Sequence, residues 1–143
     1  MIRKFQKKDM ETVLKIWLEA SIKAHNFIEA DFWKEQVQPM REIYIPNSET
    51  YVYEVESNIL GFYSLFENTL AAISVLPASQ GQGIGQQLIA HAKTQRNFLH
   101  LNVYKENEKT YQFYLLQGFQ VVSEQKDQHT NHTEYTMKYE KNR

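Results

Sequence analysis

The feature that most restricts the fold of this chain is a cluster of glycines between a strand-like apolar segment and a segment with the apolar spacing of a helix. Three of the five glycines lie within residues 80–85, in the order Gln-Gly-Gln-Gly-Ile-Gly. Glycine lacks the Cβ atom that holds a ligand away from the backbone, and a helix start offers unpaired N–H groups and a partial positive charge. The cluster therefore predicts a strand, a loop and a helix whose backbone binds an anion, such as the phosphates of a cofactor.

The segments that flank the glycines predict a βαβ unit. Before them, residues 70–76 are apolar and typical of a strand, which Pro77 ends. After them, apolar residues recur at helical spacing up to Ala92, and residues 98–103 have the pattern of a second strand. Because a helical crossover joins strands that run in the same direction, we expect the two strands to be parallel neighbours.

The N-terminal part of the chain predicts a strand and two helices. Residues 2–5 form the strand, and Asp9 is placed to cap a first helix with apolar residues at i, i+3, i+4, i+7 and i+8. A second helix runs from Asp31 to about Tyr44, and Pro39 inside it predicts a kink or a break.

Alternating apolar patterns and turn residues predict the remaining strands, and a further helix follows the βαβ unit. These elements are strands at residues 51–56 and 59–66, a helix at residues 107–117 that Gly118 ends, and strands at residues 119–125 and 134–139. The predicted order is β-α-α-β-β-β-α-β-α-β-β. It defines an α/β or α+β fold, with a mixed sheet of about seven strands and four helices, in one domain that spans residues 1–143.

The composition of the chain limits its chemistry. It has no cysteine, so disulfides, thiolate metal sites and redox chemistry by its own thiols are excluded. Its 16 basic and 17 acidic residues give a formal net charge of −1, which provides no general attraction for nucleic acid or anionic membranes. No stretch approaches ~20 uninterrupted apolar residues, and the N-terminus lacks the apolar core of a signal peptide. We therefore expect a soluble, cytoplasmic protein without a nucleic-acid or membrane partner.

Two common phosphate-binding motifs do not fit the glycine cluster. A Rossmann fingerprint needs G-x-G-x-x-G and an acidic residue about 20 positions later, whereas this chain has G-x-G-x-G, with Asn102 and Val103 at that distance. A P-loop needs Lys and then Ser or Thr after its last glycine, but Gln86 and Gln87 follow Gly85. A nucleotide-binding regulator is therefore disfavoured. On these residues alone, a glycine-rich connection without a ligand stays open.

Two motifs in the second half of the chain agree with one known family. Residues 80–85 match [QR]-x-x-G-x-[GA] at each fixed position, after a strand. Asn107 is followed seven residues later by Tyr114, on a predicted helix that ends in Gly118-Phe119. With both motifs, the chain resembles the GNAT superfamily of acyl-CoA-dependent N-acetyltransferases. The resemblance extends over the whole chain in element order and length, and is greatest to small single-domain bacterial members that acetylate protein lysines or small amines.

The resemblance implies acetyl-CoA as the cofactor. Its pyrophosphate would lie on backbone N–H groups of the glycine cluster, and its pantetheine arm, which carries peptide-like amides, would pair with the strand before the cluster. These donors require no lysine and suit a chain with little net charge. The implied cofactor-binding residues are Ile73, Val75, Gln80, Gly81, Gln82, Gly83, Ile84, Gly85 and Asn107.

Asn107 and Tyr114 are two helical turns apart, so both side chains point along one face of their helix toward the cofactor. In the family this tyrosine protonates the departing thiolate, and a phenol with a pKa of about 10 suits that role at neutral pH. The alternatives are a plain helix N-cap for Asn107 and a packed amphipathic side chain for Tyr114.

The acceptor amine must lose a proton before it attacks, because a lysine with a pKa of about 10.4 is neutral in only about one molecule in 2500 at pH 7. Some family members carry a glutamate early on the strand before the glycines, where this chain has Thr69. Glu67 is the candidate base, acting directly or through water. The alternative is an ordinary polar turn at Glu67-Asn68.

Four aromatic or imidazole side chains are predicted to contact the acceptor, namely His25, Phe27, Trp33 and Tyr104. The first three come from the two-helix segment that covers the acceptor side of the cleft in the family. Aromatic rings can flank the methylenes or the cation of a lysine, and core packing is the alternative. His129 and His132 have H-x-x-H spacing without an evident third ligand, so we expect no metal site.

The sequence thus predicts an N-acetyltransferase that moves the acetyl group of acetyl-CoA directly to a primary amine, with a protein lysine as the first candidate. The alternatives are an acetyltransferase of small-molecule amines and a non-catalytic acyl-CoA-binding module. An exposed final strand could pair with a second subunit, so a monomer and a homodimer are both compatible with the sequence.

Overall fold

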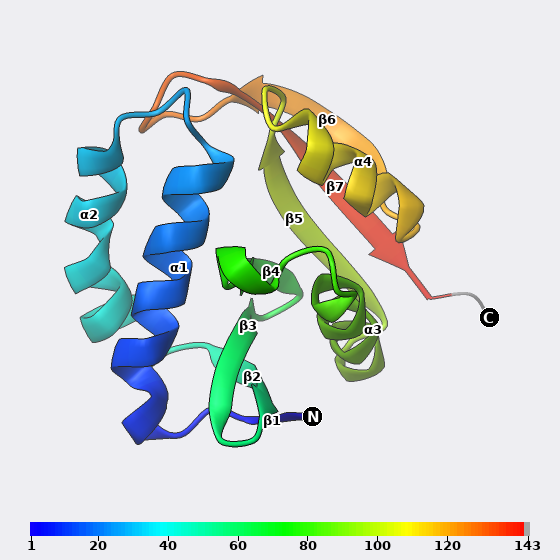
Figure 1. Cartoon of the computed structure of the whole chain (residues 1–143). Coiled ribbons are helices and arrows are strands. Elements are labelled where there is room, and N and C mark those ends of the chain that lie inside the picture. The colour runs from blue at the N-terminus through cyan, green and yellow to red at the C-terminus, as the bar shows by residue number, and fades with distance from the viewer. Residues whose placement is uncertain (142–143) are drawn as a thin grey trace.

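The computed structural model describes residues 1–141, which form a seven-stranded mixed sheet with helices on both faces (Figure 1). The strands are β1 (Ile2–Lys4), β2 (Glu49–Val55), β3 (Asn58–Phe66), β4 (Thr69–Val75), β5 (Phe98–Tyr104), β6 (Gln120–Lys126) and β7 (Thr133–Glu140). The helices are α1 (Met10–Ala24), α2 (Ala30–Pro39), α3 (Ile84–Gln95) and α4 (Glu108–Leu116), with short helical turns at Lys7–Asp9, Met40–Tyr44 and Pro77–Ser79. The predicted element order and fold class are confirmed. Within residues 1–141, no helix has the length and apolar character to cross a membrane.

The sheet has the strand order β1-β2-β3-β4-β5-β7-β6. Its one parallel pair is β4 with β5, as the βαβ pattern predicts, and the other neighbours are antiparallel. The two parallel strands are paired only at Thr69 and His100, and the His100 N–H donates to the Asn68 carbonyl at 2.8 Å. Beyond this pair the strands separate, which leaves the following residues of β4 without a strand partner on that side.

Each face of the sheet is covered by its own helices, because successive side chains of a strand point to opposite faces. Phe62 of β3 packs in a cluster with Trp17 of α1, whereas Tyr63, the next residue, packs in a second cluster with Leu88 of α3 and Tyr114 of α4. Phe62, Tyr63 and Leu88 are all fully buried. The helices α1 and α2 therefore approach the separated strands from one face and α3 and α4 from the other, as Figure 1 shows.

The structure corrects the predicted role of Asp9. This residue does precede α1, but its carboxylate accepts hydrogen bonds from the Arg3 guanidinium at 2.8 and 3.1 Å and from the Gln6 N–H at 2.8 Å, and none from the first turn of α1. The cap prediction was wrong because Arg3, on β1, competes for the carboxylate. The Arg3 guanidinium also holds the pKa of Asp9 below its usual range.

Two further sequence predictions concern the end of the second helix and the position of the last strand in the sheet. Pro39 ends α2, as predicted, and a π turn at Met40–Tyr44 takes the place of the rest of the predicted helix. The final strand, however, is not an edge strand, because β7 pairs with β5 on one side and with β6 on the other. The expectation that this strand is free to pair with a second subunit was therefore wrong, and β6 lies at the edge instead.

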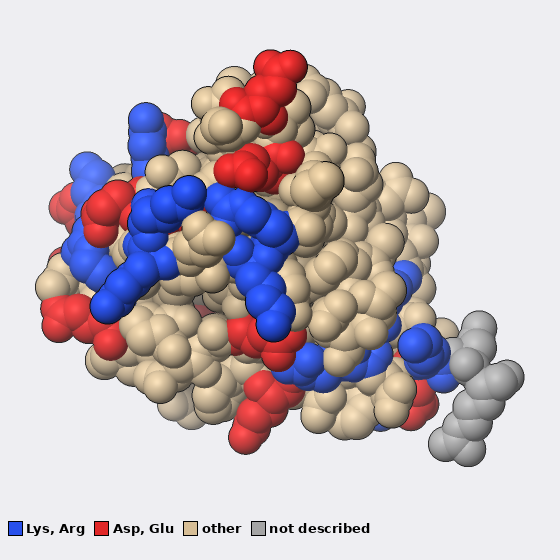
Figure 2. Space-filling model, turned by 90° about the horizontal axis from the view of Figure 1, so that it is seen from below, with Lys and Arg blue, Asp and Glu red and all other residues tan. Residues whose placement is uncertain are grey.

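Charged side chains of both signs are mixed on the face that Figure 2 shows, where Lys and Arg lie beside Asp and Glu. Ion pairs of this kind join Arg41 to Glu11 at 2.8 Å and Arg96 to Glu49 at 3.2 Å. Mixed charges produce little long-range field. An anionic ligand must therefore be held by the groups that lie directly around it.

Candidate active site

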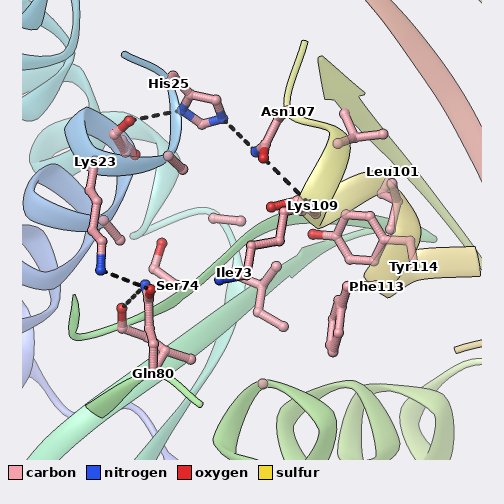
Figure 3. Close-up of a pocket in the computed structure, with 18 of the residues that line it drawn as sticks. Lys23, His25, Ile73, Ser74, Gln80, Leu101, Asn107, Lys109, Phe113 and Tyr114 are labelled. Carbon is pink, nitrogen blue, oxygen red and sulfur yellow. Dashed lines mark hydrogen bonds between the residues drawn. The ribbon is translucent and has the colours of Figure 1, made fainter. Parts of the chain in front are cut away.

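A cavity of about 750 Å³ lies where β4 and β5 separate. Both strands contribute to its wall, together with the C-terminal part of α1, the glycine loop, the start of α3 and the first turns of α4. Figure 3 shows these elements around the cavity, with side chains from α1 and α4 directed into it from different sides. The predicted βαβ unit therefore places a cavity beside the glycine cluster.

The glycine loop adopts a backbone conformation that favours glycine. Gly81 has φ +83° and Gly83 has φ +84°, and a Cβ atom at either position would meet no atom within 4 Å. A side chain would therefore have room at both positions, and glycine is favoured because the backbone there is left-handed. Gly83 directly precedes α3, so the first N–H groups of this helix are presented at the wall of the cavity.

Most predicted cofactor residues lie on the cavity wall. Lining residues among them are Ile73, Val75, Gln80, Gly81, Gly83, Ile84, Gly85 and Asn107. Gln82 is exposed and does not line the cavity, whereas Gln86 does. Gln80 is held in place by a hydrogen bond from its amide Nε2 to the Val75 carbonyl at 3.1 Å.

Two lysines missed by the sequence analysis also line the cavity. Lys23 of α1 lies 3.5 Å from the Gln80 amide oxygen, and Lys109 lies in the first turn of α4. A sequence signal existed for Lys109, because a basic residue in the first turn of a helix opposes the helix dipole unless an anion lies nearby. Both cations suit a cavity that takes an anionic ligand.

Tyr114 presents its hydroxyl to the cavity from α4 (Figure 3). The side chain is only 6% exposed and packs against Phe113 and Phe119. Burial raises the pKa of Tyr114 well above its usual value. Within residues 1–141 no group hydrogen-bonds to this hydroxyl, so a protonated phenol is available to a ligand.

Asn107 is the N-cap of α4, as one of the two alternatives predicted, and it also lines the cavity. As the N-cap of α4, its side-chain oxygen accepts from the Thr110 N–H at 3.4 Å. Its amide nitrogen lies 3.4 Å from Nε2 of His25, across the cavity wall between α4 and α1. The cap thus fixes the direction in which the amide faces the cavity.

The predicted acceptor residues form one aromatic cluster at the end of α1. The His25 ring stacks on Trp33 at 4.8 Å between centroids and meets Tyr104 edge to face at 5.3 Å. These three line the cavity, whereas Phe27 lies behind them, against Tyr104 and His132. Burial lowers the pKa of His25. The Tyr104 hydroxyl donates to Asp127, which ties the turn between β6 and β7 to this cluster.

The structure does not bring Glu67 to the cavity. Glu67 lies in the turn between β3 and β4 with an exposed side chain, and its backbone carbonyl accepts from the Arg96 Nε at 2.8 Å. The carboxylate that does line the cavity among the described residues is Glu134 of β7, which no sequence pattern indicated. Glu134 accepts a hydrogen bond from the Gln125 amide at 3.0 Å.

His129 and His132 do not form a metal site with a third ligand in the described part of the chain. Across residues 1–141, no cluster of three or more His, Cys, Asp or Glu side chains is arranged to hold a metal ion. His132 instead contacts Glu106, with 2.8 Å between Nδ1 and the carboxylate.

The separated parallel strands, the glycine loop before a helix and the tyrosine on the following helix define an acyl-CoA N-acetyltransferase. Residues 46–121 match the family model described as the acetyltransferase (GNAT) domain, and the chain belongs to this family. It is an acetyl-CoA-dependent N-acetyltransferase.

Several relatives resemble this chain over most of its length. Peptidyl-lysine N-acetyltransferase YiaC of Escherichia coli (strain K12) is 35% identical over 123 residues, which cover 85% of this chain and 84% of that protein. The solution structure of apo YjaB from Escherichia coli aligns with a TM-score of 0.85 at 25% identity, over 99% of this chain and 98% of the other. PaiA N-acetyltransferase from Thermoplasma acidophilum, solved with coenzyme A, shares the fold at a TM-score of 0.79 and 19% identity, over 98% of both chains.

Proposed function

We propose that this chain transfers the acetyl group of acetyl-CoA to the side-chain amine of a protein lysine, by direct attack of the amine on the thioester. The observation that carries the proposal is the buried Tyr114 hydroxyl, which faces the same cavity as the glycine loop. The name of YiaC, a peptidyl-lysine N-acetyltransferase, supports lysine as the acceptor. Because the chain has no cysteine, an acetyl-cysteine intermediate is excluded, which favours direct transfer. We also propose that the protein acts in the cytoplasm, as the sequence predicts.

In this proposal the cofactor lies along β4. The N–H groups of the glycine loop bind the pyrophosphate, and Lys23 and Lys109 add positive charge at the cavity wall. The pantetheine amides pair with the backbone near Ile73 and Val75, where β4 has no registered partner on β5. The thioester then lies between α1 and α4, within reach of Asn107 and Tyr114.

Tyr114 is the general acid of the proposed reaction. As the C–S bond breaks, its hydroxyl gives a proton to the coenzyme A thiolate. A phenol is protonated at neutral pH, and burial strengthens this preference, so the acid is ready in each cycle. His25, Trp33 and Tyr104 flank the methylenes and nitrogen of the incoming lysine.

The experiment is thiol release from acetyl-CoA with lysine peptides, N-terminal peptides, polyamines and aminoglycosides as acceptors, with products identified by mass. Acetylated lysine peptides are expected. Acetylated polyamines or aminoglycosides without peptide product would replace the protein substrate with a small-molecule amine. Acetyl-CoA binding without any product would favour the non-catalytic acyl-CoA-binding module.

Tyr114→Phe tests the role of the hydroxyl with little change of shape. We expect kcat/KM to fall by about 10²–10⁴-fold, the usual contribution of general acid–base catalysis, with acetyl-CoA binding retained. The matched control is Tyr111→Phe on the same helix, because Tyr111 packs on Tyr135 and does not line the cavity. Equal activity of both variants would remove the general acid from the proposal.

A further inference from the structure

One contact determines which nitrogen of His25 carries the proton. His25 directly follows α1 as its C-cap, and its Nδ1 atom lies 2.9 Å from the Ser21 carbonyl oxygen. A carbonyl oxygen only accepts hydrogen bonds, so Nδ1 must be the donor in the neutral ring. The other ring nitrogen, Nε2, then has an unshared electron pair and no proton.

The Nε2 atom is directed to the cavity, toward Asn107 (Figure 3). The Asn107 oxygen is used in the cap of α4, so the amide presents its NH₂ group to the imidazole at 3.4 Å. A donor at this position matches an Nε2 that accepts. Because 3.4 Å is long for a hydrogen bond, an N–H group of a substrate can replace this contact at little cost.

Neighbouring rings hold the imidazole in one orientation. His25 stacks on Trp33 with 25° between the ring planes and meets Tyr104 at 78°. Burial lowers the pKa of His25 from its usual value of about 6.5, so the ring is neutral at pH 7. The lone pair on Nε2 is therefore available to accept a proton and is held in one direction, toward the cavity.

The charged and titratable groups around His25 come from four elements and the turn between β6 and β7. They are Lys23 on α1, Tyr104 on β5, Lys109 and Tyr114 on α4, Glu134 on β7, and His132 behind Phe27. Burial lowers the pKa of His25, and the hydrogen bond to the Ser21 carbonyl opposes this by raising it. Among residues 1–141, neither contact of the His25 nitrogens is with a carboxylate, so no ion pair in this part of the chain holds the ring in its protonated form.

We infer that His25 Nε2 is the catalytic base, which takes the proton from the acceptor nitrogen as that nitrogen attacks the thioester. This inference rests on the proposed acetyl transfer. The acceptor attacks as the neutral amine, after its ammonium form has lost a proton to solvent. The N–C bond forms, an N–H proton of the attacking nitrogen moves to Nε2, and the C–S bond breaks while Tyr114 gives its proton to the thiolate. His25 then releases its proton to solvent and Tyr114 regains one, so the products are the acetylated amine and coenzyme A.

His25→Gln keeps a polar group at this position but removes the base. We expect kcat/KM to fall by about 10²–10⁴-fold, mostly through kcat, with acetyl-CoA binding and melting temperature close to the wild type. The matched control is His129→Gln, because His129 is an exposed histidine outside the cavity.

In His25→Ala, added imidazoles should restore activity in the order of their basicity. A higher acceptor KM at unchanged kcat, without such rescue, would make His25 a binding residue and overturn the inference.

The pH dependence of the reaction distinguishes His25 from the two carboxylates, Glu67 and Glu134, as the base. Since protonated His25 cannot accept a proton, log kcat/KM of the wild type should become steeper below the lowered pKa of His25, beyond the slope set by the amine itself. His25→Gln should lose this break, whereas Glu67→Gln and Glu134→Gln should keep it. If log kcat/KM of His25→Gln shows the break but that of Glu67→Gln or Glu134→Gln does not, the base is that carboxylate and not His25.

Nitrogen-15 NMR of the ring tests the inference without relying on turnover. We expect His25 to have its proton on Nδ1 and to titrate below about pH 6.5. A proton on Nε2, or titration above pH 7, would overturn the inference even in an active enzyme. If instead the tautomer is as expected but no lysine peptide is acetylated, the proposal of lysine as the acceptor is wrong. The His25 variants are then measured with the amine that the enzyme does acetylate.

Discussion

The two sides of the cavity are built in different ways. The proposed cofactor side is mainly backbone, since it consists of the glycine loop and the part of β4 that has no partner on β5, within residues 70–85. The proposed acceptor side is made of side chains, namely Trp33 of α2, Tyr104 of β5 and His25, which directly follows α1. A backbone site needs only a local motif, whereas a site made of side chains depends on how distant segments pack.

This difference has a chemical consequence. Every acetyltransferase of this kind meets the same cofactor, and backbone donors at a helix start bind its phosphates whatever side chains surround them. The acceptor differs from enzyme to enzyme, and a wall of side chains can change one residue at a time. Substitutions should therefore separate into effects on acetyl-CoA and effects on the amine.

Gly83→Ala is the sharpest test of the backbone side. Alanine at φ +84° is strained, and its relaxation moves the N–H groups that face the cavity. We expect the KM for acetyl-CoA to rise about tenfold, or ~1.4 kcal/mol, with little change in the acceptor KM. Steady-state kinetics with each substrate varied in turn measures this.

Gly118→Ala is the control, because it imposes the same strain at φ +93° at the end of α4, outside the cavity. Both variants should lose about 1–2 kcal/mol of stability in denaturant unfolding. Were the acetyl-CoA KM to change equally in both, the loop would act through general stability and the contrast between the two sides would disappear.

Tyr104→Phe tests the side-chain wall. The change removes the hydroxyl that donates to Asp127 and so frees the turn between β6 and β7. We expect the acceptor KM to rise about fivefold, equivalent to the ~1 kcal/mol of a typical hydrogen bond, while the acetyl-CoA KM stays constant. Tyr135→Phe, on β7 and outside the cavity, should change neither value. A rise in the acetyl-CoA KM instead would place Tyr104 on the cofactor side.

The same contrast explains which parts of the molecule could be predicted from sequence. The element order and the parallel pair follow from local apolar periods and from the handedness of a βαβ unit. The glycine loop follows from a motif of six residues. Asn107 caps α4 and Tyr114 lies two turns further on, so helical spacing predicts a shared face, and the resemblance to the GNAT family predicts that this face borders the cavity.

What could not be predicted depends on contacts between distant segments. Asp9 was assigned to cap α1 because the position of Arg3 on β1 is not visible in a local pattern. Glu134 lies on a strand that the sequence placed at the sheet edge, so its approach to the cavity had no signal. The tautomer of His25 likewise requires the carbonyl of Ser21, whose orientation only the end of α1 determines.

Lys109→Gln gives the smallest expected effect and tests whether side chains contribute at all on the backbone side. Lys109 is exposed, so its attraction for the phosphates is screened, and we expect the acetyl-CoA KM to rise only about two- to threefold at low salt. The difference from the wild type should shrink as salt is added. Lys105→Gln, which removes an exposed lysine paired with Glu124 outside the cavity, should leave the KM unchanged. An effect of Lys109→Gln as large as that of Gly83→Ala, persisting in high salt, would mean that a lysine rather than the backbone holds the cofactor.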